Sequence, residues 1–108
     1  MRVLISIAPR LYRELLALAL KERDPCLEVR VAAPQDLGRQ ARSFAPHLLL
    51  RTREAPVEQT HATSWVELNF NDGPVHATVY IEGRHSEIED AGINDLSAII
   101  DETRRSIS

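Results

Sequence analysis

The 108-residue chain has little of what marks a disulfide-bonded or membrane-spanning protein. Its single cysteine, Cys26, cannot form an internal disulfide, which fits a reducing compartment. The longest purely apolar run, 15–20, is far shorter than the roughly 20 residues of a membrane span. Polar residues and Pro9 interrupt the apolar start, so it does not resemble a signal peptide. We therefore expect a soluble, cytoplasmic protein without membrane contact.

Charge and special motifs are equally sparse. The chain holds 13 Lys and Arg against 16 Asp and Glu, with no basic block, so we expect no nucleic-acid partner. Its four glycines stand apart and form neither a dinucleotide-binding fingerprint nor a phosphate-binding loop. Its four histidines have no metal-ligand spacing, and Cys26 has no evident activating base. We expect no metal, no cofactor and no enzymatic activity. The length and the 44% hydrophobic content predict one domain, 1–108, with a genuine core.

The first half alternates strand and helix patterns. Strands are expected at 3–7, 27–31 and 47–50, and helices at 9–23 and 34–45. The first and third strands are apolar on both faces, as in a parallel sheet, whereas the second alternates like an edge strand. In the first helix, Leu11, Leu15 and Leu18 form a stripe that we expect to face the core. This rhythm predicts parallel strands joined by right-handed crossovers.

The second half predicts a β-hairpin over 65–81. Two alternating segments flank the turn residues 71–74, and pairing Phe70 with Val75 places all inward side chains on one face. The polar, acidic segment from Gly83 to Gly92 is expected to be irregular, and 53–64 to hold at most a short helix. A final helix is expected after a cap at Asn94 or Asp95.

A family resemblance covers about half of the chain. Residues 2–5, followed by 11–16, and the segment from Pro46 through Pro56 resemble a response-regulator receiver domain. The resemblance implies an α/β three-layer sandwich of the flavodoxin or receiver type. Its five-stranded sheet would be mostly parallel, and the hairpin 65–81 would make its last strand antiparallel.

The same resemblance implies a degenerate receiver. The acidic pair that holds Mg²⁺ in the family falls on Ile7 and Ala8, which offer no side-chain oxygen. The phosphoacceptor aspartate falls on Thr52 or Arg51, and the family's lysine on Gly83 or Arg84. Without the metal, nothing neutralises the charge on a transferred phosphoryl group. We therefore expect a phosphorylation-independent protein.

Two candidate sites remain. Ligands collect outside the carboxyl ends of strands in doubly wound sheets, which makes a possible ligand site of Ser6, Arg51, Thr52 and Arg53. The alternative is that both arginines merely solvate the loop. A possible protein interface lies on the polar-aromatic face of the hairpin, which carries Trp65, Glu67, Asn69, His76, Thr78 and Tyr80. Here the alternative is that Trp65 and Tyr80 merely cover the end of the sheet or pack under 83–93.

These observations predict a non-catalytic, receiver-like interaction or regulatory module that acts through protein–protein contacts. The expected partner is another protein or a second copy, with a homodimer through the hairpin. The alternative is a small-ligand sensor or an enzyme that uses the strand ends near Ser6, Thr52 and Arg51. A domain that stabilises a larger complex is a third option.

Overall fold

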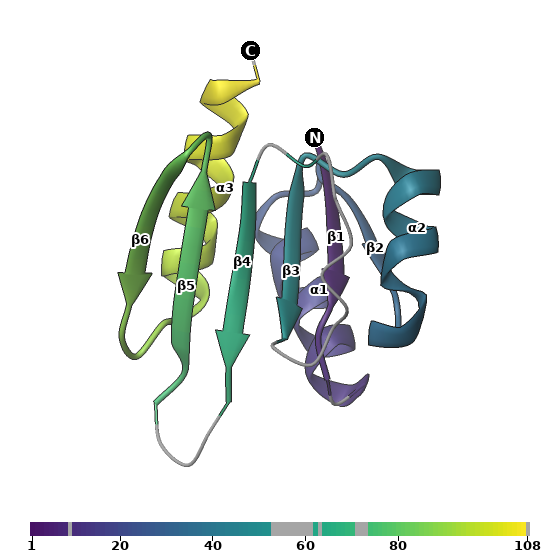
Figure 1. Cartoon of the computed structure of the whole chain (residues 1–108), viewed down its shortest axis with the longest axis horizontal. Coiled ribbons are helices and arrows are strands. Elements are labelled where there is room, and N and C mark those ends of the chain that lie inside the picture. The colour runs from purple at the N-terminus through teal and green to yellow at the C-terminus, as the bar shows by residue number, and fades with distance from the viewer. Residues whose placement is uncertain (9, 53–61, 63, 71–73, 108) are drawn as a thin grey trace.

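A mixed sheet of six strands, in the order β2-β1-β3-β4-β5-β6, forms the centre of the computed structural model (Figure 1). The structure describes residues 1–8, 10–52, 62, 64–70 and 74–107. The strands are β1 (Arg2–Ser6), β2 (Glu28–Val31), β3 (Leu48–Thr52), β4 (Ser64–Asn69), β5 (His76–Ile81) and β6 (Arg84–Ile88). β2, β1, β3 and β4 pair in parallel, and β4, β5 and β6 pair antiparallel.

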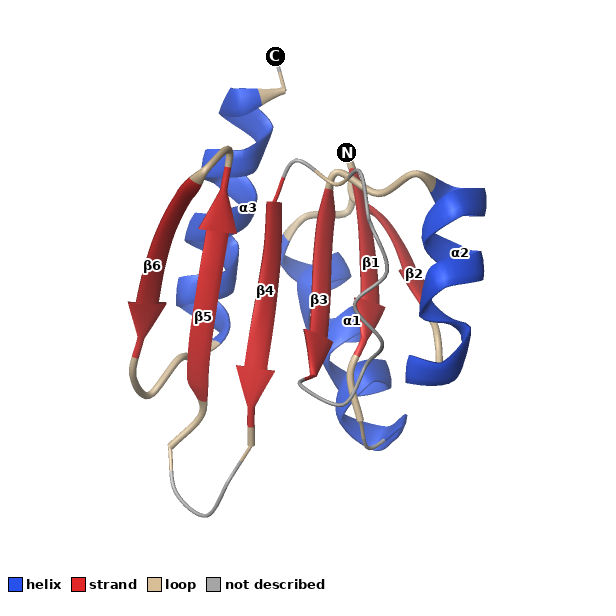
Figure 2. Ribbon diagram, in the orientation of Figure 1, coloured by secondary structure: helices blue, strands red, loops and turns tan. Residues whose placement is uncertain are grey.

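Helices lie on both faces of this sheet (Figure 2). They are α1 (Arg10–Arg23), α2 (Leu37–Phe44), which follows a 3-10 turn at Pro34–Asp36, and α3 (Ile93–Ser106). α1 and α3 pack on one face, and α2 packs on the other beside β1 and β2. Among the described residues, no helix covers the second face over β4, β5 and β6 (Figure 1).

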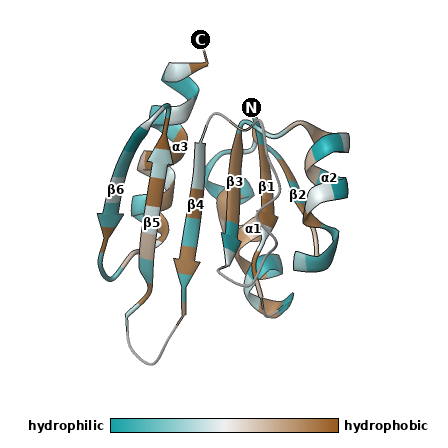
Figure 3. Cartoon of the chain, in the orientation of Figure 1, coloured by the Kyte–Doolittle hydropathy of each residue, from teal (hydrophilic) through white to brown (hydrophobic). Residues whose placement is uncertain are grey.

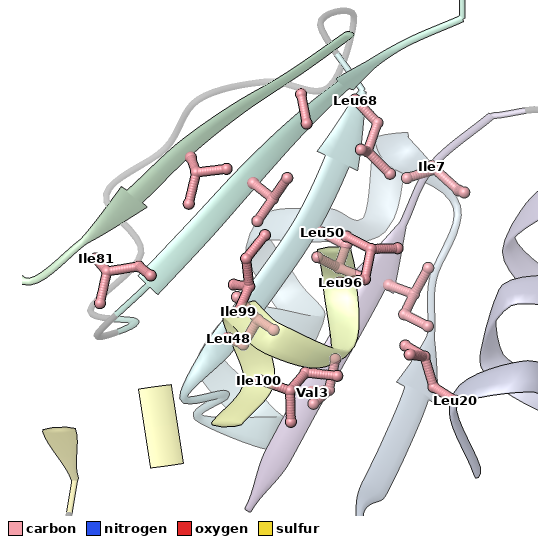
Figure 4. Close-up of a cluster of buried hydrophobic side chains, with 14 of the residues drawn as sticks. Val3, Ile7, Leu20, Leu48, Leu50, Leu68, Ile81, Leu96, Ile99 and Ile100 are labelled. Carbon is pink, nitrogen blue, oxygen red and sulfur yellow. The ribbon is translucent and has the colours of Figure 1, made fainter. Parts of the chain in front are cut away.

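The larger part of the core lies between the sheet and the pair α1 and α3. Leu96, Ile99 and Ile100 of α3 pack toward Val3 and Leu48 of the central strands (Figure 4). The smaller part, under α2, contains Leu4, Ala32, Leu37, Ala41 and Leu49. β3 is buried along its whole length because both parts of the core meet on it.

The prediction of a five-stranded, mostly parallel sandwich of the flavodoxin or receiver type is wrong. The sheet has six strands, and β4 to β6 form an antiparallel unit at one side. The hairpin register is confirmed, since Trp65 pairs with Tyr80 and Asn69 with His76. No described helix lies between β4 and β5, so a parallel crossover of the receiver type is absent there.

β6 replaces part of the segment that we expected to be irregular. Glu82 and Gly83 both have positive φ angles, 46° and 83°, and they join β5 to β6 as a two-residue turn. All of β6 except Ile88 is exposed, and the strand is largely hydrophilic (Figure 3). An edge strand of this kind lacks the apolar alternation by which strands are usually found.

α1 packs on the sheet with a different side from the one that the sequence predicts. Leu11, Leu15 and Leu18 are 61%, 54% and 59% exposed, whereas the core contacts come from Leu16, Ala17 and Leu20. The prediction that the first stripe faces the core is therefore wrong. The run 15–20 is apolar around much of the helix, so periodicity alone could not choose between the two stripes.

α3 begins at Ile93, slightly before the expected caps. Asp95 lies in its first turn, where its carboxylate accepts a 2.8 Å hydrogen bond from the backbone N–H of Gly92. This contact satisfies a donor that a helix start leaves without an intrahelical partner. Across the described part of the chain, every helix is too short or too polar to cross a membrane.

Candidate functional site

The predicted ligand residues do not form one cluster. Ser6 and Arg51 are neighbours in the β1–β3 register, and the alternation of the two strands places both side chains on the α2 face. Thr52 pairs with Leu68 of the main core, so it faces α1 and α3 on the opposite side. Arg53, the fourth predicted member, lies outside the described residues.

Ser6, Arg51 and Thr52 are nevertheless unusual polar residues. They are 0%, 8% and 3% exposed. Their Oγ, Nη1 and Oγ1 atoms are buried and have no hydrogen-bond partner in the described structure. Unpaired buried polar atoms are uncommon in folded proteins, because each costs about 1–3 kcal/mol.

Arg51 does have two contacts on the face of β4 and β5 that no described helix covers. Its Nη2 atom lies 4.0 Å from the Glu67 carboxylate, and its guanidinium lies 4.9 Å from the centre of the Trp65 ring. Trp65 in turn stacks on Tyr80, with ring centres 5.5 Å apart and planes 10° apart. An arginine, a tryptophan and a tyrosine from three adjacent strands thus form one stack.

The remaining predicted interface residues continue this face. His76 Nε2 lies 3.0 Å from a carboxylate oxygen of Glu87 in β6, a contact that the sequence did not predict. Asn69, Thr78 and all other predicted interface residues are half-buried. The face therefore carries few large exposed apolar groups, and several of its polar groups already pair with one another.

Among the described residues, most of the large exposed hydrophobic side chains lie elsewhere, on or beside α1. We call it the α1 surface, and it consists of Leu11, Tyr12, Leu15, Leu18 and the adjoining Phe70, each at least 36% exposed. Tyr12 and Phe70 are in contact, with ring centres 5.3 Å apart. Phe70 follows β4, so the surface joins α1 to the end of the hairpin.

A groove of about 310 Å³ adjoins the α1 surface. Tyr12, Leu15 and Leu16 line it from α1, and Ile93 and Leu96 line it from α3. Leu68 and Val75 close it at the hairpin end. These side chains are apolar apart from the tyrosine hydroxyl, so the groove suits an apolar group rather than a charged one.

The sequence pattern predicts that Leu11, Leu15 and Leu18 of α1 lie in the core. A signal was present, since the first helix has more apolar positions than a single core-facing stripe requires. Such a helix is either buried on several sides or carries a second apolar contact surface. The stacking of Arg51 on Trp65 had no sequence signal, because it depends on which strands are neighbours.

Side chains that could act in catalysis or bind a metal are scattered among the described residues. His47 Nδ1 accepts a 3.0 Å hydrogen bond from the backbone N–H of Arg2. Burial and the positive charge of Arg2 lower the pKa of His47 below its usual value. Cys26 is exposed, and its backbone N–H donates to Asp24 Oδ1. Within the described ranges, no three His, Cys, Asp or Glu side chains are placed to hold a metal ion.

Comparison with known proteins adds no assignment to this geometry. No protein-family model matches the chain, and no curated protein matches it. The resemblance to receiver domains therefore stays a prediction.

Proposed function

We propose that this domain is a non-catalytic protein-interaction module that docks through the α1 surface. The observation that carries the proposal is the exposure of Leu11, Leu15 and Leu18, each more than half accessible on one side of a helix. The resemblance to receivers, which places Ile7 and Ala8 at the acidic pair and Thr52 or Arg51 at the phosphoacceptor position, supports a role without phosphorylation.

The exposed leucines are costly in water. Full burial of one leucine side chain contributes about 1.5–3 kcal/mol, and here three lie within two helical turns. Their neighbours Tyr12 and Phe70 enlarge the apolar area, and the groove beside them is also apolar. Contiguous apolar patches of this kind typically mark contact sites, whereas single exposed leucines do not.

The hairpin face ranks second as a docking surface. Its aromatic rings stack on each other, and Glu67 and Glu87 pair with Arg51 and His76. A partner would have to replace these internal contacts, so less free energy is available per contact. We therefore move the proposed main interface from the hairpin to α1.

Site-specific photo-crosslinking in cells that naturally make the protein tests this proposal. A photoreactive amino acid at position 18 should form a protein adduct, either between two copies or between the chain and another protein. The matched control places it at Ser43, an exposed position of α2 on the opposite face. Equal labelling from both positions, or none from position 18, would contradict the proposal.

A second variant separates docking from folding. Leu15→Gln with Leu18→Gln should remove the adduct formed from position 11 while changing the free energy of unfolding of the monomer by less than about 1 kcal/mol. A large loss of stability would mean that the leucines serve the fold, and the proposal would fail.

One observation favours a second candidate, a small-anion sensor. The buried Nη1 of Arg51 and Oγ of Ser6 have no partner among the described residues, and both side chains lie on the same face. Phosphate, sulfate and mononucleotides should then raise the melting temperature of the wild type but not of Arg51→Met. No ligand-dependent shift in the wild type would rule this candidate out.

A further inference from the structure

We propose that the occupant of the α1 surface is a second copy of this chain, with the two α1 helices antiparallel about a two-fold axis. This inference rests on the proposed function and deepens it by naming the partner. It is carried by the spacing of the leucines and by the charges that flank them.

The leucine spacing fits helix-on-helix packing. Leu11, Leu15 and Leu18 follow steps of four and three residues, and Glu22 continues the same line. At about 100° per residue, these four positions lie within an arc of about 60°. A seam this narrow is typical of two packed helices, where each leucine enters a gap between residues of the facing helix.

Antiparallel packing makes this seam match itself. With the axis midway between Leu15 and Leu18, Leu15 of one copy meets Leu18 of the other, and the symmetry repeats the contact. Leu11 then meets the aliphatic part of Glu22, whose carboxylate reaches solvent at the end of the seam. The two helix dipoles also oppose each other in this orientation, which is favourable.

The flanking charges favour the same orientation. Glu14 and Lys21 are exposed and lie on one flank of the seam, while Tyr12 and Ala19 lie on the flank next to the groove. In the antiparallel arrangement, Glu14 of each copy lies beside Lys21 of the other, which gives two attractive pairs. Parallel helices would place Glu14 beside Ala19 instead, without any charge complementarity.

The contact area sets the strength of the expected dimer. The 14 residues of α1 extend over about 21 Å, and Tyr12 and Phe70 widen the contact on the groove side. This is a modest interface compared with the roughly 800 Å² per partner of a standard one. We therefore expect a reversible dimer with a dissociation constant on the order of micromolar.

A membrane surface is the competing occupant for an amphipathic helix. Membrane-surface helices usually carry lysine and arginine on the polar side, which attract anionic lipid. α1 also carries four basic residues, but Glu22 stands on the line of the leucines itself and Glu14 flanks it, and the chain has a net charge of −3. The position of Glu22 favours a protein partner, because a helix that inserted its leucines into a bilayer would bury this carboxylate as well.

Sedimentation equilibrium on the full chain tests the inference through a charge swap. Glu14→Lys brings two cationic side chains together twice per dimer, and Lys21→Glu brings two glutamates together in the same places. Each single variant should raise the dissociation constant at least about tenfold, since two attractive pairs become repulsive. The double variant restores opposite charges, so it should dimerise within about threefold of the wild type.

A further variant and a vesicle-binding measurement distinguish a dimer from the other occupants. Leu18→Glu should abolish dimerisation, and far-UV circular dichroism checks that it folds. The inference is overturned if the wild type stays monomeric at high concentration, or if the double swap is no better than either single variant. Binding of the monomer to phosphatidylserine vesicles would also overturn it. An adduct from position 18 to a different protein would then still support the proposed function, so the two failures are distinguishable.

Discussion

Thr103 of α3 and Ser64 of β4 share a hydrogen bond of 2.9 Å between two side chains that are completely buried. The Thr103 hydroxyl also lies 2.9 Å from the carbonyl oxygen of Ile99, one turn earlier. The pair ties the C-terminal helix to the first strand of the antiparallel unit, 39 residues away.

Thr103→Val removes this hydrogen bond while keeping the shape of the side chain. We expect the free energy of unfolding to fall by about 1–3 kcal/mol, because the Ser64 hydroxyl is left unpaired in the core. Ser64→Ala in addition should cost much less than the sum of the two single changes. Urea denaturation of the four proteins checks this cycle, and strict additivity would contradict it.

Substitutions of Arg51 and of Glu67 should change the stability by unequal amounts. Glu67→Gln should destabilise the domain by about 1–3 kcal/mol, since the buried guanidinium loses its charged neighbour at 4.0 Å. Arg51→Met should cost less, because a methionine packs against Trp65 without an unpaired donor and the Glu67 carboxylate that loses its partner is the more exposed of the two groups. Thermal denaturation at neutral pH distinguishes the two. A larger loss for Arg51→Met than for Glu67→Gln would show that the charge is needed.

Because the pKa of His47 is lowered, we expect the domain to lose stability in mild acid. This pKa in the folded protein is lowered from the usual 6.5 by burial first and by Arg2 second. The unfolded chain therefore takes up a proton more readily, and the stability falls as the pH drops from above 6.5 through the folded pKa. His47→Asn keeps an acceptor for the Arg2 N–H and should flatten this part of the profile.

Asp24 provides the internal control for that measurement. Its pKa is lowered from 3.8, mainly by the hydrogen bond from Arg104. Its contribution is present above pH 3.8 and is lost only as the pH falls through the still lower folded pKa. The profile of His47→Asn should therefore retain a steep loss in strong acid. A wild-type profile that is flat between pH 7 and 5 would contradict the role of His47.

Tyr80→Ala tests whether the hairpin face belongs to the fold or to an interface. The stack on Trp65 stabilises the β4–β5 pair, so the substitution should cost about 1–3 kcal/mol in the free energy of unfolding. The dimerisation constant should change by less than about threefold, because α1 lies on the other face of the sheet. A variant that is fully folded but monomeric would return the interface to the hairpin.

The sequence was informative wherever a single pattern decided the structure. The alternation in 65–81 allowed only one register that kept Val66, Leu68 and Val79 on one face, and the structure has that register. The continuous apolar strands around Leu4 and Leu49 likewise indicated central, parallel positions. In both cases the local pattern and the tertiary contacts impose the same arrangement.

Prediction from the sequence was wrong where the local pattern allowed two structures. β6 is polar on both faces, so its strand character comes from pairing with β5 rather than from alternation. α1 has two apolar stripes, and the choice between them depends on where α3 packs. Ser6 and Thr52 both lie at strand ends, but the period of two sends their side chains to opposite faces. Within one strand, Arg51 and Thr52 could therefore not share a site.

The sheet is buried unevenly, so we expect it to open locally from the β6 edge. β3 is covered on both faces along its length, whereas the residues of β6 are almost all exposed. Amide protons of β6 should therefore exchange with solvent through small fluctuations at that edge, while those of β3 should require global unfolding. The Arg84–Glu102 ion pair, which links β6 to α3, is mostly exposed and adds little resistance to such opening. The antiparallel edge can thus fray and re-form while the parallel strands and the packed side of α1 keep their structure.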